Sequence, residues 1–379
     1  MAAFTEEYRY PCEQCGSELR FAAGQSALKC SHCGHVQRIV EAGSDTPWVI
    51  KGKAFDELDL AHGLKNDLPA TVQEDVRTMN CPNCGAMVEF QGAIHATECP
   101  FCATPLVVDS GSHRMIKPQA LIPFQLDEPS ARKALIAWLG RLWFAPSRLL
   151  EFTRAGRAMN GVYIPYWTFD ANTRSQYRGA RGDYYYETRT VIVNVNGRNE
   201  QRQERVQKIR WRPASGNVTR RFDDVIVIAA TSLPADLCDG LEPWDLAALQ
   251  SYRPDYIAGF QAEGYTVALA DGHQTGRDKM NRVIAQDVRR DIGGDVQRVD
   301  RVDSDFRAET FKHILLPVWI AAYKYGGKSY RFLVNGQTGE VQGERPWSVW
   351  KIAFAVLGAM ILAACLAYLY YLNNPDTFR

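Results

Sequence analysis

The sequence has no excess of charge of either sign. Its 44 Lys and Arg residues and 43 Asp and Glu residues leave a formal net charge of +1 over 379 residues. This balance gives no general attraction to nucleic acid or to anionic lipid. The charges are spread unevenly, because residues 1–108 hold 8 basic and 14 acidic residues, a net charge of −6 against +7 for the remainder. The N-terminal part is therefore acidic.

Nothing at the N-terminus resembles a signal peptide. The start, MAAFTEEYRYPCEQC, contains two early glutamates and no apolar run, so we expect translation to begin in the cytosol. In that reducing compartment, eight of ten cysteines in four Cys-x-x-Cys pairs predict metal or redox chemistry and not a disulfide framework. The apolar fraction of 46% and the charged fraction of 23% are those of a folded protein.

No catalytic motif stands out. The stretch GGKS at residues 326–329 has Ala322 where a P-loop needs its first glycine, and its surroundings predict strand, turn, strand. Cys238 has no histidine near it in the sequence, so we interpret it as a small buried residue. We predict that the protein is not an enzyme. An active site assembled from distant residues in the middle of the chain stays open as a third interpretation.

The cysteines form two sets with the same spacing. In each set, two Cys-x-x-Cys pairs are separated by 14 residues, and the second set follows the first at a constant offset of 69. The same offset aligns Gly16 with Gly85 and Phe21 with Phe90, which indicates a duplicated module. The predicted metal ligands are Cys12, Cys15, Cys30 and Cys33 in the first set, and Cys81, Cys84, Cys99 and Cys102 in the second.

Each set has the pattern of a zinc ribbon, because four thiolates satisfy a tetrahedral Zn²⁺ ion. A module of about 25 residues cannot bury enough apolar surface to fold alone, so each ribbon should fold as it binds its ion, which contributes about 10 kcal/mol or more. Four thiolates leave no open position, so we expect two structural Zn²⁺ ions. Iron is an alternative metal. His32 or His35 could replace a thiolate, although an exposed or outer position is favoured for both.

A structural ion implies that the ribbons bind a partner. Residues 79–108 contain Glu89 and Glu98 but no Lys or Arg, whereas a nucleic-acid surface must neutralise several phosphates. A protein partner is therefore favoured over nucleic acid. A nucleic-acid interface would need the basic remainder of the chain, although alternation there favours the solvent face of one strand. The residues in question are Arg202, Arg205, Lys208, Arg210 and Arg212.

The middle of the chain predicts an α+β domain. Apolar spacing and helix-start signals predict helices from Pro129 to about Trp143 and from about Thr275 to Ile292. Strand-forming residues dominate 162–228, with intervening turns such as Asn196-Gly197. The aromatic run at 184–186 is interpreted as sheet surface or core.

A second set of strands is expected from about residue 312 to residue 341, as a small antiparallel meander. Gly326-Gly327 and Asn335-Gly336 supply its turns. YIPYW at 163–167 and LLPVW at 315–319 both place Trp two residues after Pro, which suggests a second internal duplication, of a helix-plus-strand unit.

The segment Ile352–Leu372 holds 21 residues without a charge and would measure about 31 Å as a helix, enough to span a bilayer. It contains no ionisable pathway for transport, and Cys365 lies deep within it. Aromatic residues flank it as in membrane-interface belts: Trp347, Trp350, Tyr368, Tyr370 and Tyr371. Small residues repeat every four positions on one helical face, where another helix could approach: Ala355, Ala359, Ala363 and Ala367.

Flanking charges predict the orientation of this span. Arg331, Arg345 and Lys351 precede it, and Arg379 follows it, so the positive-inside rule places the N-terminal side in the cytoplasm. We expect a single-pass protein of the cell inner membrane with a short outer tail.

The whole chain resembles a bacterial family of membrane-anchored proteins with transcription-factor-IIB-type zinc ribbons, often labelled as relatives of a primosomal helicase. The resemblance rests on CEQCG…CSHCG, CPNCG…CPFCA, VYIPYWTFD, LLPVWIAAYKYGGKSYRFLVNGQTGEV and the final span. It implies an association with phage-shock protein A-like and flotillin-like (SPFH) proteins of envelope-stress systems. A helicase activity is rejected, because the chain lacks a P-loop, an acidic Walker-B strand and room for two motor domains.

The sequence therefore predicts a multidomain protein: two N-terminal four-cysteine zinc ribbons, an α+β middle domain with antiparallel sheets and a suggested duplication, and one C-terminal transmembrane helix. We expect a bacterial membrane adaptor that recruits protein partners to the cytoplasmic membrane face, with a membrane-tethered nucleic-acid-binding regulator as the alternative. The expected parts are ribbon 1 (1–40), an acidic linker (41–78), ribbon 2 (79–110), the cytoplasmic domain (111–345), the membrane helix (346–372) and a tail (373–379).

Overall fold

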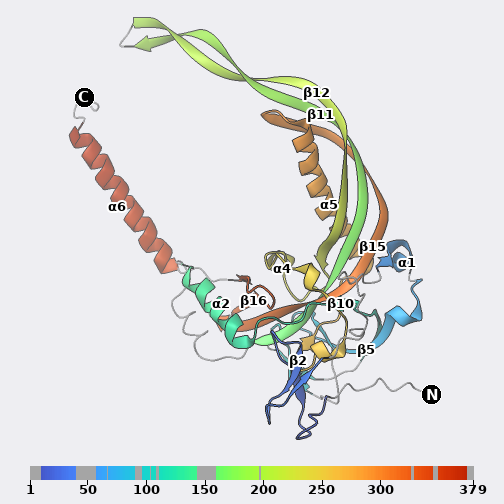
Figure 1. Cartoon of the computed structure of the whole chain (residues 1–379). Helices are drawn as coiled ribbons and strands as arrows, with labels where there is room; N and C mark the ends of the chain where they lie inside the picture. The colour runs from blue at the N-terminus through green and yellow to red at the C-terminus, as the bar shows by residue number, and fades with distance from the viewer. Residues whose placement is uncertain are drawn as a thin grey trace.

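Three very long antiparallel strands dominate the structure (Figure 1). β11 (Asn160–Val195) lies between β12 (Arg198–Ile228) and β15 (Val296–Tyr325). The expectation of several shorter strands between 162 and 228 is wrong, because glycines that suggested turns lie inside β11; Gly182, for example, leaves room for the Trp211 ring of β12. The computed structural model describes residues 10–39, 57–65, 67–89, 96–102, 104–107, 111–142, 159–195, 198–325, 328–344 and 349–373.

All three strands are irregular at the same level. β11 shifts its register near Asp170 against both neighbours, and Asp224 of β12 and Ala308 of β15 adopt positive φ angles of 53° and 49°. Such bulges bend strands and increase their twist. The bend separates a curved arm from the rest of the central sheet. We call that remainder, with the helices and short strands packed on it, the base; both ribbons lie next to it. The arm comprises residues 172–195, 198–222 and 296–307.

α5 (Leu269–Ile292) packs against the concave face of the arm and contacts all three long strands (Figure 1). Its buried face lies against aromatic and aliphatic side chains of the sheet, and these form one apolar cluster. The helix is amphipathic, as its spacing predicted. The buried apolar residues of the helix are Leu269, Met280, Ile284, Val288 and Ile292.

α5 begins six residues before the predicted start at Thr275. Two glycines lie in the first half of the helix although glycine is a weak helix former: Gly272 precedes the predicted start, and Gly276 lies just inside it. In the structure these glycines let the helix approach the sheet. A Cβ atom added to Gly272 would lie 2.5 Å from the Trp167 ring, and one added to Gly276 would lie 2.8 Å from the Phe169 ring.

The base contains the same arrangement twice. A short strand leads into a helix and then into a long strand: β10 (Ala120–Leu121), α2 (Glu128–Gly140) and β11, and again β14 (Gln261–Ala262), α5 and β15. Each short strand pairs in parallel with the long strand of the other half, β10 with β15 and β14 with β11. The two halves therefore interlock.

Side-chain contacts repeat in the same way. The Trp167 indole N–H donates to the Val267 carbonyl at 3.1 Å, two residues before α5, and the Trp319 indole N–H donates to the Leu126 carbonyl at 2.9 Å, two residues before α2. These are the tryptophans of the YIPYW and LLPVW segments, which pair antiparallel across β11 and β15. The matching contacts agree with a repeated helix-plus-strand unit.

The predicted helix near 129–143 is present as α2. Asp127 caps it by accepting from the Ser130 N–H at 3.0 Å, and Pro129 lies in its first turn. The predicted meander is also present, as β15, β16 (Lys328–Asn335) and β17 (Val341–Gly343). The predicted turns at 196–197 and 326–327 lie outside the described residues.

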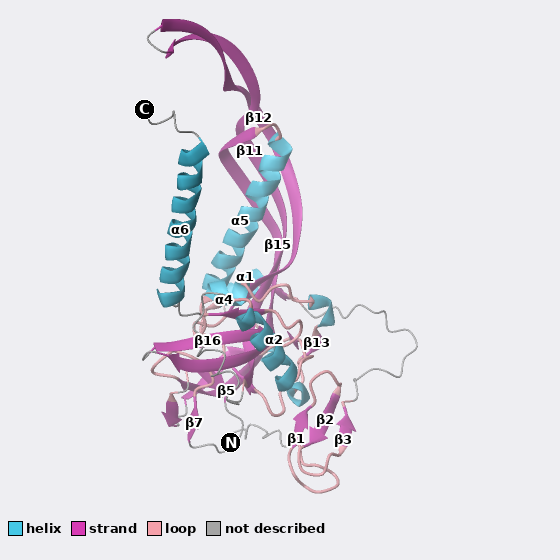
Figure 2. Ribbon diagram, turned by 90° about the vertical axis from the view of Figure 1, so that its left-hand side faces the viewer, coloured by secondary structure: helices cyan, strands magenta, loops and turns pink. Residues whose placement is uncertain are grey.

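The N-terminal region forms two separate sets of short strands below the base (Figure 2). Ribbon 1 is a three-stranded sheet, and ribbon 2 combines a three-stranded and a two-stranded sheet. Between them, part of the expected linker joins the central sheet, since β4 pairs with β15. The elements are β1 (Leu19–Phe21), β2 (Ala27–Cys30), β3 (Val36–Arg38), β4 (Leu58–Asp59), α1 (Leu60–Leu64), η1 (Ala70–Val72), β5 (Gln73–Asn80), β6 (Met87–Glu89), β7 (Ala96–Glu98), β8 (Pro105–Val107) and β9 (Gly111–Ile116). Short elements elsewhere are α4 (Ala235–Asp239), η2 (Leu246–Ala248), β13 (Gln250–Ser251) and η3 (Pro254–Tyr256).

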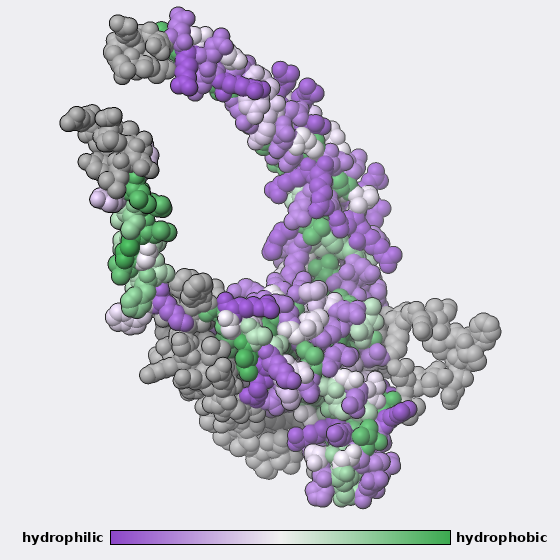
Figure 3. Space-filling view, turned by 60° about the vertical axis from the view of Figure 1, so that its left-hand side comes forward, coloured by the Kyte–Doolittle hydropathy of each residue, from purple (hydrophilic) through white to green (hydrophobic). Residues whose placement is uncertain are grey.

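α6 (Val349–Asn373) follows the base and packs against no other described element. The window Ala353–Tyr370 has a mean hydropathy of 2.2, and none of it is buried. Figure 3 shows this helix as almost wholly hydrophobic, opposite an arm that is mostly hydrophilic. By length and composition, α6 is able to cross a membrane.

Candidate metal centres

The first cysteine set comes from two tight turns of ribbon 1, one before β1 and one between β2 and β3. The Sγ atoms of Cys12 and Cys33 lie 3.5 Å apart, and those of Cys15 and Cys30 lie 3.6 Å apart. All four Sγ atoms lie within 4.8 Å of one another. A tetrahedron with Zn–S bonds of about 2.3 Å has edges of about 3.8 Å. The cluster therefore has the size that a zinc ion needs.

The second cysteine set repeats this geometry in ribbon 2. The Sγ atoms of Cys81 and Cys102 lie 3.6 Å apart, as do those of Cys84 and Cys99, again with all four within 4.8 Å. Thr104 adds a polar neighbour, because its Oγ1 lies 3.1 Å from Cys102 Sγ. A hydroxyl at this distance stabilises a thiolate.

The backbone of the turns explains the shared geometry. In the first three turns, a glycine four residues after the first cysteine has a positive φ angle and donates its N–H to that cysteine's carbonyl: Gly16 at 72°, Gly34 at 77° and Gly85 at 74°. Glycine adopts this left-handed conformation without a steric penalty. In all four turns the first cysteine donates its N–H to the carbonyl five residues ahead: Ser17, His35, Ala86 and Thr104 for Cys12, Cys30, Cys81 and Cys99.

In both clusters, the side chains that could bind a metal ion are all cysteines. His32 is exposed, and neither it nor His35 belongs to the first cluster. The eight predicted residues thus gather as two closed sets of four thiols, and each set could hold a zinc ion. Such an ion would bind all four sulfurs as thiolates and would hold the two turns of a ribbon together. That these cysteines are the ligands, and that the metal is zinc and not iron, remain predictions.

Ribbon 1 docks on the base through the Phe21 ring and two backbone hydrogen bonds. The Phe21 ring lies 5.4 Å from that of Tyr256 and 6.4 Å from that of Phe260. Its backbone N–H donates to the Ala258 carbonyl at 2.9 Å, and the Gly24 N–H donates to Phe124 at the same distance. Apolar residues of ribbon 1 and α2 therefore share one core cluster. The sequence repeat marked Phe21 by its alignment with Phe90, which lies outside the described residues.

Ribbon 2 docks on the opposite half of the base and is buried more deeply. Phe101 is fully buried, and Val88 forms a bridge with Glu263. The Glu263 side chain is itself fully buried, accepts a hydrogen bond from the Ser232 hydroxyl at 2.9 Å, and has a pKa raised to about 8 by burial. Cys238 lies in the same cluster, and burial raises the pKa of its thiol to about 12. The interpretation of Cys238 as a buried residue is confirmed.

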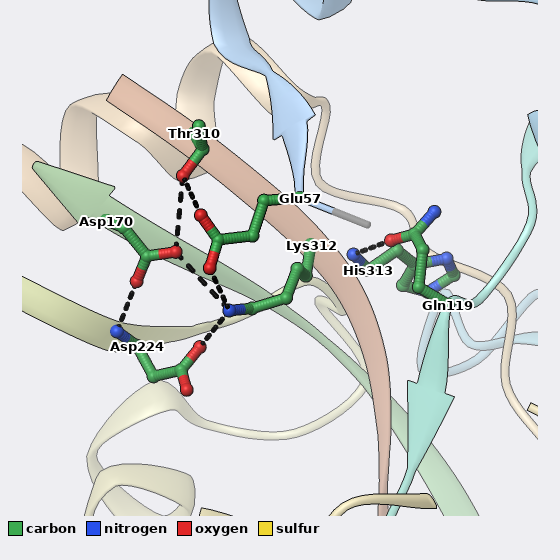
Figure 4. A network of polar contacts seen from close by, with 7 residues as sticks. All are labelled: Glu57, Gln119, Asp170, Asp224, Thr310, Lys312 and His313. Atoms are coloured by element: carbon green, nitrogen blue, oxygen red, sulfur yellow. Dashed lines mark hydrogen bonds and ion pairs between the residues drawn. The ribbon is translucent and has the colours of Figure 1, made fainter. Parts of the chain in front are cut away.

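A buried charge network lies at the bend of the three long strands (Figure 4). The Lys312 ammonium, with its side chain only 6% exposed, lies 2.7 Å from Asp224, 3.3 Å from Asp170 and 3.3 Å from Glu57. Thr310 donates to Glu57 at 2.8 Å. The network thus joins β11, β12 and β15 to the segment between the ribbons. No sequence motif indicated it, because its members are up to 255 residues apart.

The basic residues considered for nucleic acid lie on β12 in the arm, and they do not form one patch. Alternation along the strand puts Arg205 on one face and the other four on the opposite face. Lys208 is ion-paired with Glu187, and the Arg205 and Arg210 guanidinium groups lie over the rings of Tyr186 and Tyr185. Much of this basic charge is already engaged within the arm.

Two known proteins are similar to this chain. One is from Bacillus subtilis (strain 168) and is named Uncharacterized protein YdjG; it is 25% identical over 347 residues, which cover 91% of this chain and 92% of that protein. The other is Transcription factor S of Sulfolobus acidocaldarius, 32% identical over 76 residues, which cover 20% of this chain and 66% of that protein. No family model and no solved structure matches the chain.

Proposed function

We propose that the protein is a membrane-anchored adaptor, with no catalytic activity of its own, whose zinc ribbons recruit a protein partner to the cytoplasmic face of the inner membrane. The observation that carries this proposal is the pairing of two closed four-cysteine clusters with one helix able to cross a membrane. A closed site has no position for a substrate, so the ribbons act through their surfaces.

The exposure of the clusters favours ribbon 1 as the partner-binding module. Cys15 and Cys33 are exposed, and Val36 on β3 is 46% exposed. Cys84 and Cys102 are half-buried, since ribbon 2 packs more deeply on the base. Phage-shock protein A-like and SPFH proteins, implied by the family resemblance, are the first partners to test in an envelope-stress role.

The second candidate is a membrane-tethered nucleic-acid-binding regulator. Its support is the similarity to Transcription factor S over 76 residues. Against it stand the absence of Lys and Arg from residues 79–108 and the internal pairing of basic residues on the arm. Binding to nucleic acid depends on free cations that can neutralise phosphates.

A crosslinked pull-down of the full-length protein from membranes separates the two candidates. The wild type is compared with Cys12→Ser plus Cys15→Ser in ribbon 1 and with Cys81→Ser plus Cys84→Ser in ribbon 2. Cys365→Ser in α6 is the control, because it removes a thiol without touching either cluster. The adaptor proposal expects a protein that is captured by the wild type and the control and is lost from the ribbon 1 variant.

A nuclease-treated sample completes this experiment. If nuclease strips everything that the wild type captures, the ribbons act on nucleic acid and the adaptor proposal fails. If the protein washes out of the membrane fraction in alkaline carbonate, α6 is not an anchor and the proposed location fails.

A further inference from the structure

The far part of the arm carries an exposed aromatic face. α5 ends at Ile292, beside Gly179, so the paired segments 182–192 and 201–211 extend beyond its cover (Figure 1). We call the side bearing the even-numbered residues of 182–192 and the odd-numbered residues of 201–211 the aromatic face. Its large side chains are Ile192 (68% exposed), Tyr186 (52%), Tyr184 (43%), Trp211 (41%) and Ile209 (40%).

The two faces of this ribbon differ sharply in charge. On the aromatic face, Arg205 is the one charged residue, and the remaining positions are Gly, Thr, Gln or apolar. The opposite face carries ion pairs, including Arg189 with Glu204 at 3.4 Å and Lys208 with Glu187. In the part of the arm that α5 covers, the apolar side faces that helix. In residues 182–192 and 201–211, past the end of α5, the apolar side chains lie on the opposite side of the sheet. They face solvent in the described structure.

The chemistry of the aromatic face fits a membrane surface. Tyr and Trp rings favour the headgroup level of a bilayer, because one end of each is apolar and the other polar. Arg205 lies 4.3 Å from the Tyr186 ring centre, and Arg298 lies 5.7 Å from that of Trp211, so guanidinium groups accompany the rings. Residues 181–212 have a net charge of +4. Arg205 contributes its charge on the aromatic face itself, whereas most of the other cations of the segment lie on the opposite face. An anionic leaflet attracts cations that lie near its surface.

We propose that the aromatic face of the arm rests on the anionic headgroup surface of the membrane that α6 crosses. This inference depends on the proposed membrane anchorage, because α6 would bring the arm to a bilayer. It also requires the base to turn relative to α6, since Figure 1 draws the far part of the arm level with the C-terminal end of that helix. The ribbon stays at the headgroup level. The outer edges of a two-stranded ribbon carry unpaired backbone groups, and these require water or headgroups as partners.

The arrangement favours lipid over nucleic acid on this face. Single-stranded nucleic acid needs cations beside the stacking rings, so that phosphates and bases are bound together. Here most cations of the ribbon lie on the face opposite to Trp211 and Tyr184 and are engaged with acidic residues or rings. Packing of two copies through their aromatic faces is the remaining competitor.

Quenching by brominated lipid tests the proposal. Full-length zinc-loaded protein is reconstituted into vesicles of phosphatidylcholine with about one third phosphatidylglycerol, with and without brominated acyl chains. The emission of Trp211 is taken as the difference between wild type and Trp211→Phe. The buried Trp244 serves as the control through Trp244→Phe. We expect bromination to quench the Trp211 emission by at least half and to leave that of Trp244 within a tenth.

Two neighbouring tyrosines supply a matched pair of variants. Tyr184 lies on the aromatic face and Tyr185 on the opposite face. Tyr184→Glu should reduce the quenching of Trp211 at least twofold, and Tyr185→Glu should leave it unchanged. Vesicles without phosphatidylglycerol should reduce it in the wild type. Circular dichroism of both variants checks that the sheet is retained.

Several outcomes would overturn the proposal. Unquenched Trp211 emission in protein that floats with the vesicles after carbonate washing rejects the lipid contact while leaving the anchor intact. Protein that fails to float rejects the anchor first. A Trp211 signal that follows the number of copies per vesicle, and not bromination, assigns the face to a second copy. A signal that changes only with added single-stranded nucleic acid assigns it to that polymer.

Discussion

The two ribbons share one cysteine pattern but differ in how far the base buries them. Ribbon 1 rests on the base through Phe21 and leaves Cys15 and Cys33 exposed. Ribbon 2 places Phe101 at full burial in a cluster that includes the central strands, and its outer cysteines are half-buried. The same metal-binding unit can thus be an accessible module or a part of the core. The difference in burial arises from the residues that surround the cysteine pairs.

Removal of the second metal cluster should produce the largest effect. Cys81→Ser plus Cys84→Ser should abolish one zinc and destabilise the base by several kcal/mol, because a structural site contributes about 10 kcal/mol to the fold that it holds. Cys12→Ser plus Cys15→Ser should also abolish one zinc, but it should destabilise the base less, because the outer cysteines of ribbon 1 are exposed and the ribbon is buried less deeply. Zinc content and calorimetry measure both quantities. Equal losses of stability would show that the ribbons do not differ in this way.

Removal of the Lys312 ammonium should be the next largest effect. Lys312→Met leaves Asp170 and Asp224 without their buried cation, and burial already raises the pKa of Asp170. We expect a loss of about 3–5 kcal/mol in the free energy of unfolding. The control is Lys279→Met, which breaks a more exposed pair with Asp239 and should cost about 1 kcal/mol or less. Denaturant titration measures both; a neutral Lys312→Met would refute a structural role.

The free energy of unfolding should depend on pH through the Glu263 carboxyl, which contacts ribbon 2. The Glu263 carboxyl, beside β6, has a pKa of about 8 in the fold against 4.5 in a model peptide. Between these values the folded state binds the extra proton, so stability should fall as pH rises from about 5 to 8. Glu263→Gln keeps an acceptor for Ser232 and should reduce this slope. Part of the slope should remain, because burial also raises the pKa of the Glu89 carboxyl, to about 7. Melting temperatures across that pH range test it, and an unchanged slope would contradict the assignment.

The smallest expected effect is on the zinc affinity of ribbon 2, through a threonine that contacts one cysteine sulfur. Thr104 Oγ1 lies 3.1 Å from Cys102 Sγ, and the corresponding residue of ribbon 1, at an offset of 69, is His35. Thr104→Ala should weaken zinc binding in ribbon 2 by about tenfold, as loss of an outer-shell hydrogen bond does. His35→Ala should leave zinc binding in ribbon 1 unchanged, because its backbone carbonyl makes the contact with Cys30. Competition with a chromogenic chelator measures both affinities.

The sequence alone determined the local features of this protein. The spacing of eight cysteines predicted two clusters that the structure brings together, since the four cysteines of each ribbon lie within 22 residues of the chain. The apolar run of 21 residues predicted α6, and the capping residues around Pro129 predicted α2. These features depend on neighbours in the chain, which a sequence shows directly.

The tertiary structure decided what depends on distant segments. It merged the strands expected in 162–228 into two long ones, because β11 pairs with β12 on one side and β15 on the other through glycines that elsewhere make turns. It started α5 early, because Gly272 and Gly276 fit against Trp167 and Phe169. The Lys312 network, the interlocked halves and the unequal burial of the ribbons also join residues far apart in the chain. Such contacts are set by packing and charge compensation in three dimensions, and no local pattern encodes them.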